Sequence, residues 1–232
     1  ELILANVRKT RKLVRGLSWG GEGSEWGAYE KFHNYSESDH ALKESFIEDC
    51  VRESGSDTVW DIGANTGQFS RIVARHTKQV LAMDIDHFAV ERMYRKNVVE
   101  GVENVLPLVQ NVCDPSPNWG WRNRERSDLS SRAKPDLVLC LALIHHVVIT
   151  ANVPLDEFVA WLAGLSQRLV IEYVSRSDDK VKTLLRNKED KYGDYSRANL
   201  EAELARHFTV QRQFSLESGN RFLYLCQKFQ PG

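Results

Sequence analysis

The chain has 232 residues, 42% of them hydrophobic, which is enough for one compact domain to bury a core without disulfides or metal ions. The 31 basic and 32 acidic residues leave a net charge of −1, so no global field recruits a polyanion, and we expect no nucleic acid partner. Four isolated cysteines lack the paired spacing of zinc sites and disulfide frameworks, which favours a reducing, cytoplasmic location.

The sequence also shows no pattern typical of a membrane-spanning segment. No apolar run approaches the roughly 18 residues that span a bilayer, and the chain does not start with a signal-peptide stretch. We therefore expect a soluble protein with no membrane partner. Residue 1 is Glu rather than Met, which suggests a trimmed chain or one domain of a larger multidomain polypeptide.

Residues 1–45 are polar and uneven, and we expect them to form an N-terminal lid or appendage on a core of residues 46–232. A basic run from Arg8 to Lys12 predicts a solvated helix face, with contact to an acidic partner surface as the alternative. Three aromatic residues of this segment are candidates for the substrate pocket, with ordinary packing as the alternative: Trp26, Tyr29 and Tyr35.

From residue 42 onward, short apolar runs alternate with amphipathic stretches of helical length. This alternation predicts an α/β fold with a doubly wound, mostly parallel sheet covered on both faces. Strands are predicted over 58–62, 79–84, 105–109, 137–142 and 169–174, and helices over 42–51, 68–76, 88–100 and 199–207. The arginine-rich segment 119–134 is predicted to be a surface loop or short helix.

The chain ends differently from its middle. Two more apolar runs, 209–216 and 221–228, are joined across Glu217-Ser218-Gly219-Asn220, a composition typical of a hairpin turn. We therefore expect the parallel sheet to finish in an antiparallel hairpin.

The first predicted strand ends in the pattern Asp-x-Gly-x-Asn-x-Gly, formed by Asp61, Gly63, Asn65 and Gly67. Ligands of open parallel sheets bind beyond the carboxyl ends of the strands, and the two glycines permit a tight turn with a close backbone approach. The pattern therefore predicts a cofactor-binding loop. A nicotinamide oxidoreductase is disfavoured because Gly-x-Gly-x-x-Gly is missing.

This loop and the terminal hairpin resemble class I S-adenosylmethionine-dependent methyltransferases over about residues 55–228. The resemblance implies a Rossmann-like, seven-stranded sheet and S-adenosyl-L-methionine as the cofactor. It also implies that Asp61 holds the cofactor's ammonium group, directly or through water.

Further cofactor contacts are expected at the ends of the next strands. Asp84 is placed to accept the ribose hydroxyls, while Asp86 is expected to cap the following helix. The resemblance places Asn111 near the adenine amino group, with Asp114 as the fallback and a plain loop role as the alternative. The remaining cofactor candidates are Ile85 and Val112, which follow Asp84 and Asn111, and Leu141 on the predicted fourth strand.

The predicted fourth strand leads into His145 and His146, and the fifth carries Glu172. Histidine is a suitable general base near neutral pH, and a neighbouring carboxylate orients it in catalytic triads. We therefore expect His145, held by Glu172, to take the acceptor's proton, with His146 as the alternative base. No metal is expected, because the side chains of adjacent histidines diverge.

The His-Glu pair resembles metal-independent O-methyltransferases, including the domains of modular polyketide synthases. That resemblance implies methylation of the β-hydroxyl or enol of an acyl chain on an acyl carrier protein. A sugar, polysaccharide or small phenolic hydroxyl is the alternative acceptor, and a non-catalytic adenosylmethionine-binding module is the alternative class. The Asn-Pro-Pro-Tyr motif of adenine amino-methyltransferases is absent. Tyr192 and Tyr195 are further candidates for the acceptor pocket.

Overall fold

A computed structural model describes residues 1–17, 37–186, 188–189 and 191–229. The predicted pocket residues Trp26, Tyr29 and Tyr35 lie outside these described residues. Among the helices that are described, none is both long enough and apolar enough to cross a bilayer.

A seven-stranded mixed sheet forms the centre of the protein, with the strand order β3-β2-β1-β4-β5-β7-β6. Its strands are β1 (Thr58–Ile62), β2 (Gln79–Asp84), β3 (Val105–Val109), β4 (Leu137–Cys140), β5 (Arg168–Val174), β6 (Phe208–Ser215) and β7 (Arg221–Lys228). The first five strands are parallel, whereas β7 is antiparallel to both β5 and β6. The predicted α/β class and terminal hairpin are therefore confirmed.

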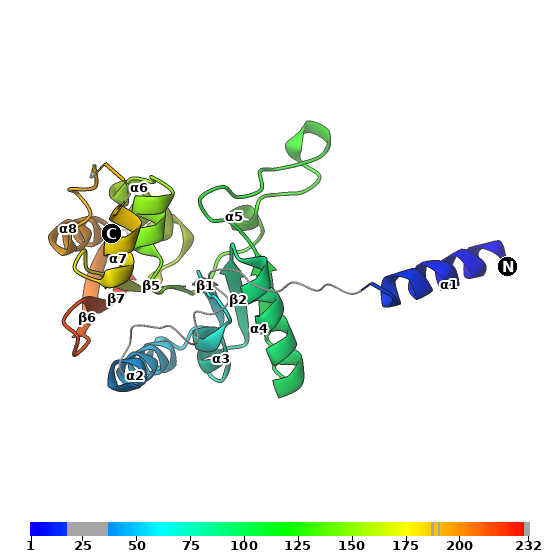
Figure 1. Cartoon of the computed structure of the whole chain (residues 1–232), viewed down its shortest axis with the longest axis horizontal. Helices are drawn as coiled ribbons and strands as arrows, with labels where there is room; N and C mark the ends of the chain where they lie inside the picture. Colours follow the sequence, from blue (N-terminus) through cyan, green and yellow to red (C-terminus); the bar gives the residue numbers. More distant parts are fainter. Residues whose placement is uncertain (18–36, 187, 190, 230–232) are drawn as a thin grey trace.

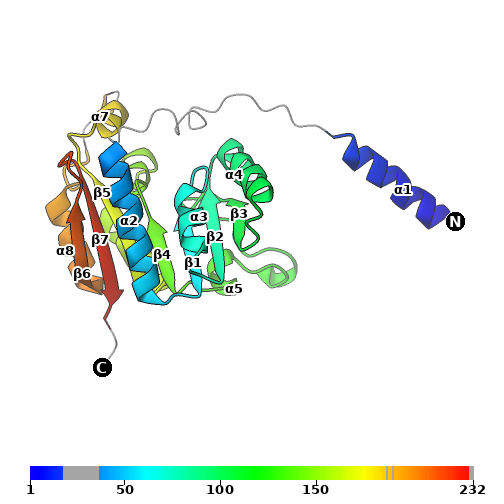
Figure 2. The same cartoon turned by 90° about the horizontal axis from the view of Figure 1, so that it is seen from below.

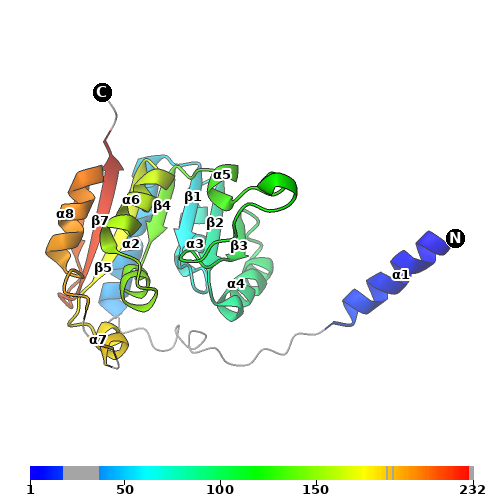
Figure 3. The same cartoon turned by 90° about the horizontal axis from the view of Figure 1, so that it is seen from above.

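Helices cover both faces of this sheet. Figures 2 and 3 show α2 on the face opposite α6. The helices that pack on the sheet include α2 (Glu37–Ser54), α3 (Gln68–Ala74), α4 (His87–Glu100), α6 (Leu155–Leu165) and α8 (Arg197–His207). Further short elements are η2 (Trp121–Asn123), α5 (Leu129–Arg132), η3 (His146–Thr150) and α7 (Asp179–Leu185).

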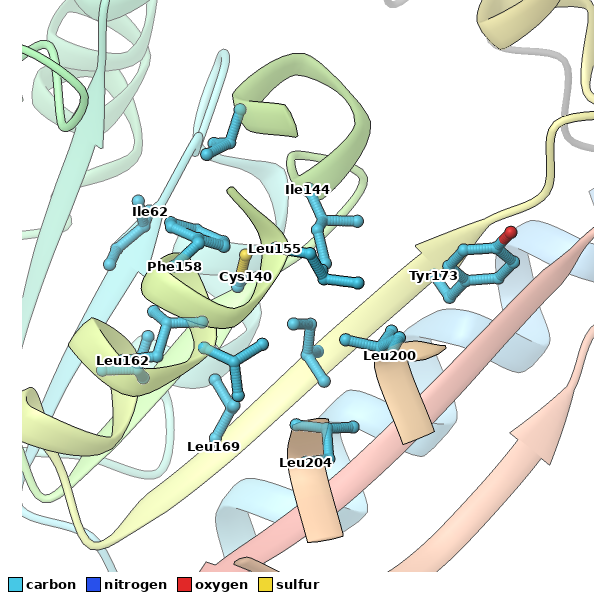
Figure 4. Close-up of a cluster of buried hydrophobic side chains, with 14 of the residues drawn as sticks. Ile62, Cys140, Ile144, Leu155, Phe158, Leu162, Leu169, Tyr173, Leu200 and Leu204 are labelled. Atoms are coloured by element: carbon cyan, nitrogen blue, oxygen red, sulfur yellow. The ribbon is translucent and has the colours of Figure 1, made fainter. Parts of the chain in front are cut away.

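Each face of the sheet has its own hydrophobic core. On one face, Leu162 of α6 and Leu200 and Leu204 of α8 pack against β4 and β5, as Figure 4 shows. On the other face, Ile47 and Cys50 of α2 pack on the same central strands. Because both faces are covered, the central strands are mostly apolar on both sides, which explains the nearly continuous apolar runs in the sequence.

The first helix, α1 (Leu2–Arg15), is not part of either core. None of its side chains is buried, and Figure 1 shows it apart from the sheet. The predicted boundary between a lid and a core at residues 45 and 46 falls inside α2, so residues 37–45 continue the helix that packs on the sheet.

The helix predicted over 42–51 is longer than expected because a tertiary contact holds its polar start. The carboxylate of Asp39 accepts hydrogen bonds from the backbone N–H groups of Glu217 (2.6 Å) and Ser218 (3.3 Å), in the turn between β6 and β7. The strand predicted over 137–142 is shorter than expected, since the positive φ of 49° at Ala142 turns the chain after β4.

The turn before α3 gives a stability prediction. Gly67 has a φ of +75°, and an added Cβ would lie 2.5 Å from Cγ of buried Met93. Gly101 has a similar φ of +67° but open space around it. We expect Gly101→Ala to cost about 1 kcal/mol of backbone strain, and Gly67→Ala to cost about 1–3 kcal/mol more through overpacking. Urea denaturation of both variants measures the difference, and equal losses would contradict the steric explanation.

Candidate active site

A cavity of about 400 Å³ opens at the carboxyl ends of the central parallel strands. Its wall is formed by α2, the loops after β1, β2, β3 and β4, and the turn η3. The strand order reverses between β1 and β4, so the cavity lies where open α/β sheets bind their ligands. Its volume is in the range of small-molecule and cofactor sites.

Most of the predicted cofactor residues meet in this cavity. Those that line it are Asp61, Gly63, Asn65, Asp84, Ile85, Asn111, Val112 and Leu141. Gly67 does not line it; it is the N-cap of α3, in a tight space next to Met93. Asp114, the fallback for Asn111, does not line it either.

Asp61 is the charged group at the end of β1. Its side chain is only 2% exposed, and its carboxylate accepts a hydrogen bond of 2.5 Å from the Ser70 hydroxyl. Burial raises the pKa of Asp61 to about 6, although the Ser70 hydrogen bond and the nearby Lys43 ammonium favour the ionised form. The carboxylate is therefore mostly ionised at neutral pH and can hold a cation in the cavity.

The loop after β1 is tied to β2. The backbone N–H groups of Gly63 and Ala64 both donate to the Met83 carbonyl, at 2.8 and 2.9 Å. Gly63 has a φ of +79°, and a Cβ there would lie 3.0 Å from the Leu143 side chain. The missing side chain keeps this part of the cavity open.

Asp84 closes β2 and organises the rim. Its carboxylate accepts backbone N–H groups from Asn65 (2.7 Å) and Asp86 (2.8 Å). A carboxylate has about four lone-pair sites, so some acceptor capacity remains for hydroxyl groups in the cavity. Burial raises the pKa of Asp84, whereas the backbone hydrogen bonds that its carboxylate accepts lower it. Asp86 caps α4 by accepting from the Phe88 N–H at 2.8 Å, as predicted.

Asn111 lies on the cavity wall after β3. Its side-chain oxygen accepts a hydrogen bond of 3.0 Å from the Cys113 N–H, which fixes the orientation of the side chain. Gln110, Val112 and Cys113 line the same edge. Together with Ile85, which is 61% exposed, they give this edge a largely apolar surface between polar groups.

The two predicted base candidates occupy different positions. His146 lines the cavity at the start of η3, a π-helical turn, whereas His145 lies behind it and is 3% exposed. Their ring centroids are 4.1 Å apart. Burial lowers the pKa of His146 to about 4 and that of His145 well below its ordinary value. Both rings are therefore neutral at pH 7, and His146 is the one that faces the cavity.

The predicted contact between Glu172 and His145 is wrong. Glu172 is fully buried and binds two cations instead: Lys43 Nζ at 2.6 Å and Arg221 at 3.2 Å. Arg221 also binds Asp178, the cap of α7, at 3.0 Å. Nδ1 of His145 has no hydrogen-bond partner within the described part of the chain. Glu172 therefore organises a buried ionic network rather than orienting a histidine.

Lys43 is a buried, charged cavity residue that sequence reasoning missed. Only 2% of Lys43 is exposed, and its ammonium lies 4.5 Å from the centroid of the Phe69 ring. Lys43 and the buried residues Ile47 and Cys50 recur at helical spacing on one face of α2. The sequence signal for Lys43 was its position on the apolar face of a predicted helix. A lysine there is buried, and a buried lysine needs a charged partner.

The two tyrosines predicted for the acceptor pocket do not line the cavity. Tyr195 is fully buried in the core, where its hydroxyl donates to the Val174 carbonyl at 2.6 Å. The Tyr192 hydroxyl donates to Asn152 at 2.5 Å. Both tyrosines were predicted from their position in the segment after β5. In the structure, Tyr195 packs in the core and Tyr192 makes a loop contact, so neither side chain reaches the cavity.

No group of three or more histidine, cysteine or acidic residues with metal-binding geometry occurs among the residues the structure describes. The four cysteines are all unpaired, and three of them are buried.

No protein-family model matches the chain. The chain is 31% identical over 209 residues to the nodulation protein NoeA of Rhizobium meliloti (strain 1021). That alignment covers 90% of this chain but 44% of NoeA, so the chain spans less than half the length of this curated relative.

Solved structures of class I adenosylmethionine-dependent methyltransferases share the fold. The N-methyltransferase NodS of Bradyrhizobium japonicum WM9, in complex with S-adenosyl-L-homocysteine, aligns with a TM-score of 0.61 and 12% identity over 83% of this chain and 88% of NodS. The magnesium protoporphyrin IX methyltransferase ChlM of Synechocystis PCC 6803, with bound adenosylmethionine, aligns with a TM-score of 0.56 and 16% identity over 91% of this chain and 87% of ChlM. The chain therefore has the class I methyltransferase fold.

The ionic network gives a prediction about stability. Glu172→Gln keeps the shape of the side chain but leaves the buried Lys43 and Arg221 without their shared anion, so we expect a loss of about 3–5 kcal/mol in the free energy of unfolding. The matched control is Glu203→Gln on α8, whose ion-pair partner Arg206 is exposed to solvent, with an expected loss below about 1 kcal/mol. Urea denaturation measures both, and a small loss for both variants would show that the network is unimportant.

Proposed function

We propose that this chain is an S-adenosylmethionine-dependent methyltransferase that methylates a hydroxyl group. The observation that carries the proposal is the cavity at the reversal of strand order, where Asp61, Asp84 and Asn111 share a wall with the neutral imidazole of His146. The class I methyltransferase fold supports it, as do solved relatives with bound adenosylmethionine or adenosylhomocysteine.

The cavity residues fit the chemical groups of this cofactor. Asp61 and Lys43 give one end of the cavity a carboxylate beside an ammonium, which complements the ammonium and carboxylate of an amino acid. Asp84 retains acceptor capacity for ribose hydroxyls. Asn111 and the apolar edge around Val112 and Ile85 suit a purine ring. The cavity needs no phosphate-binding group, because adenosylmethionine carries no phosphate.

On the acceptor side, His146 is the residue we assign as general base. Bound adenosylmethionine supplies an electrophilic methyl group on a sulfonium centre. A hydroxyl is a weak nucleophile unless its proton is removed as the new bond forms, and His146 is the imidazole placed in the cavity to accept that proton. Burial lowers its pKa to about 4, so it acts as a weaker base than an exposed histidine. This assignment replaces His145 with its neighbour because only His146 lines the cavity.

The acceptor itself is a narrower proposal. A β-hydroxyl or enol of an acyl chain on an acyl carrier protein is the acceptor implied by the resemblance to polyketide O-methyltransferase domains. Because Glu172 does not contact His145, that resemblance is weaker than the sequence suggested. Sugar and phenolic hydroxyls should therefore be assayed as acceptors alongside carrier-bound acyl chains. NodS is described as an N-methyltransferase, which adds amines to the panel.

Asp61 makes cofactor affinity depend on pH. Its pKa of about 6 means that the carboxylate ionises between pH 5 and pH 7, whereas α-amino groups stay protonated over this range. Adenosylmethionine should therefore bind about tenfold more tightly at pH 7 than at pH 5, because only the ionised carboxylate attracts the ammonium. Isothermal titration calorimetry at both values measures this shift.

The control for that titration is Asp61→Asn, which should bind adenosylmethionine about 10- to 100-fold more weakly at pH 7 and show little pH dependence. NAD serves as the control ligand and should not bind. Tight binding of NAD with no binding of adenosylmethionine would overturn the proposed function.

His146 should matter for transfer but not for cofactor affinity. We expect His146→Ala to bind adenosylmethionine within about twofold of the parent protein and to lose about 10²- to 10⁴-fold in turnover, the usual contribution of a general base. Intact-mass assays of methyl transfer to hydroxyacyl carrier proteins, phenols, sugars and amines provide the turnover measurement.

His145→Ala is the paired variant. A larger loss of turnover in His145→Ala than in His146→Ala would return the base assignment to His145. Transfer to amines alone would replace the hydroxyl acceptor with a nitrogen acceptor while keeping the methyltransferase assignment.

A further inference from the structure

The helix α1 presents an apolar face that no described part of the chain covers. All of its side chains are exposed. Its large apolar residues, and the one that follows it, are between 57% and 80% exposed: Leu2, Ile3, Leu4, Val7, Leu13, Val14 and Leu17. Apolar surface of this extent on a single helix marks an interaction site rather than scattered exposure.

Charge on α1 has one sign. The helix carries five of the chain's 31 basic residues and none of its 32 acidic residues. These basic residues are Arg8, Lys9, Arg11, Lys12 and Arg15. Because the whole chain has a net charge of −1, this concentration is local and opposes the charge balance of the rest of the protein.

The two kinds of side chain lie on separate faces. At about 100° per residue, all the large apolar residues except Leu4 fall within an arc of roughly 140°, and the five basic residues fill the remainder. Two polar residues, Asn6 and Thr10, lie within the apolar arc. The Thr10 hydroxyl donates to the Asn6 carbonyl at 2.9 Å, so burying this face leaves that hydroxyl satisfied.

We propose that α1 is an interfacial helix that binds the surface of an anionic lipid membrane. An amphipathic helix with a basic polar face lies in the plane of the membrane, with its apolar face at the boundary between headgroups and acyl chains. Lys9 and Arg11 border the apolar arc, where long basic side chains reach back to the lipid phosphates. The absence of any acid on the helix favours a uniformly anionic surface over a protein groove of mixed charge.

This inference is compatible with the lack of a spanning helix among the described residues. At about 1.5 Å per residue, α1 is about 21 Å long, which is too short to cross a bilayer but sufficient to lie on one. The expectation of no membrane partner rested on the lack of a spanning segment, and an interfacial helix needs none. The inference does not depend on the proposed methyltransferase activity.

The test uses the full chain and two kinds of vesicle, one of phosphatidylcholine alone and one of equal parts phosphatidylcholine and phosphatidylglycerol. We expect sedimentation with the anionic vesicles and little with the neutral ones. Replacing Arg8, Arg11 and Arg15 with Gln should weaken binding about a hundredfold, since each basic residue near an anionic surface contributes about a fivefold effect.

Two further variants test the apolar face. Val7→Asn with Val14→Asn changes helix propensity little but removes buried apolar area, so binding should fall at least about tenfold. Asn6→Leu should strengthen binding, because it removes an amide from the middle of the apolar arc. Urea denaturation should show the same core stability for all of these variants, because α1 buries no residue.

The charge-matched control removes three exposed basic residues elsewhere, through Arg95→Gln, Lys182→Gln and Arg206→Gln. This control should bind anionic vesicles like the parent chain. Equal binding to neutral and anionic vesicles, no binding to either, or equal losses in the control and the α1 variant would overturn the proposal. Retained adenosylmethionine binding in that case would show that the failure concerns α1 alone.

Discussion

The structure depends on one buried anion, the carboxylate of Glu172. It joins Lys43 from α2 and Arg221 from β7, and Arg221 continues the network to Asp178 at the start of α7. Moving these charges out of water is costly, so each one requires the others to be in place. The network therefore ties the helix before the sheet to the last strand, and it brings Lys43 to the cavity wall.

The charges of this network influence the protonation states of the cavity residues. Lys43 favours the ionised form of Asp61 against burial, and it adds to the effects that keep His145 neutral. Asp61 is in turn fixed by the Ser70 hydroxyl. In one cavity, a carboxylate next to an ammonium suits a zwitterionic donor, and a neutral imidazole suits a hydroxyl acceptor. The proposed function thus rests on charges set by contacts between distant segments.

The fold was largely predictable because its signals are local. The strands 58–62, 79–84 and 105–109 were predicted with the bounds that the structure shows, since each is a short apolar run between clear breaks. The terminal hairpin was recognisable from its turn composition. The start of α2 was not, because its polar residue Asp39 is buried by the turn between β6 and β7, about 180 residues later.

The sequence alone determined the α/β class, the loop from Asp61 to Gly67 and the placement of Asp84 and Asn111 at one edge, because each follows from strand ends and chain direction. Tertiary structure decided the rest. Which imidazole reaches the cavity depends on the turn after β4, and the partner of Glu172 depends on which cations the helix α2 and strand β7 bring to it. Such pairings follow from packing between distant segments, which local patterns do not encode.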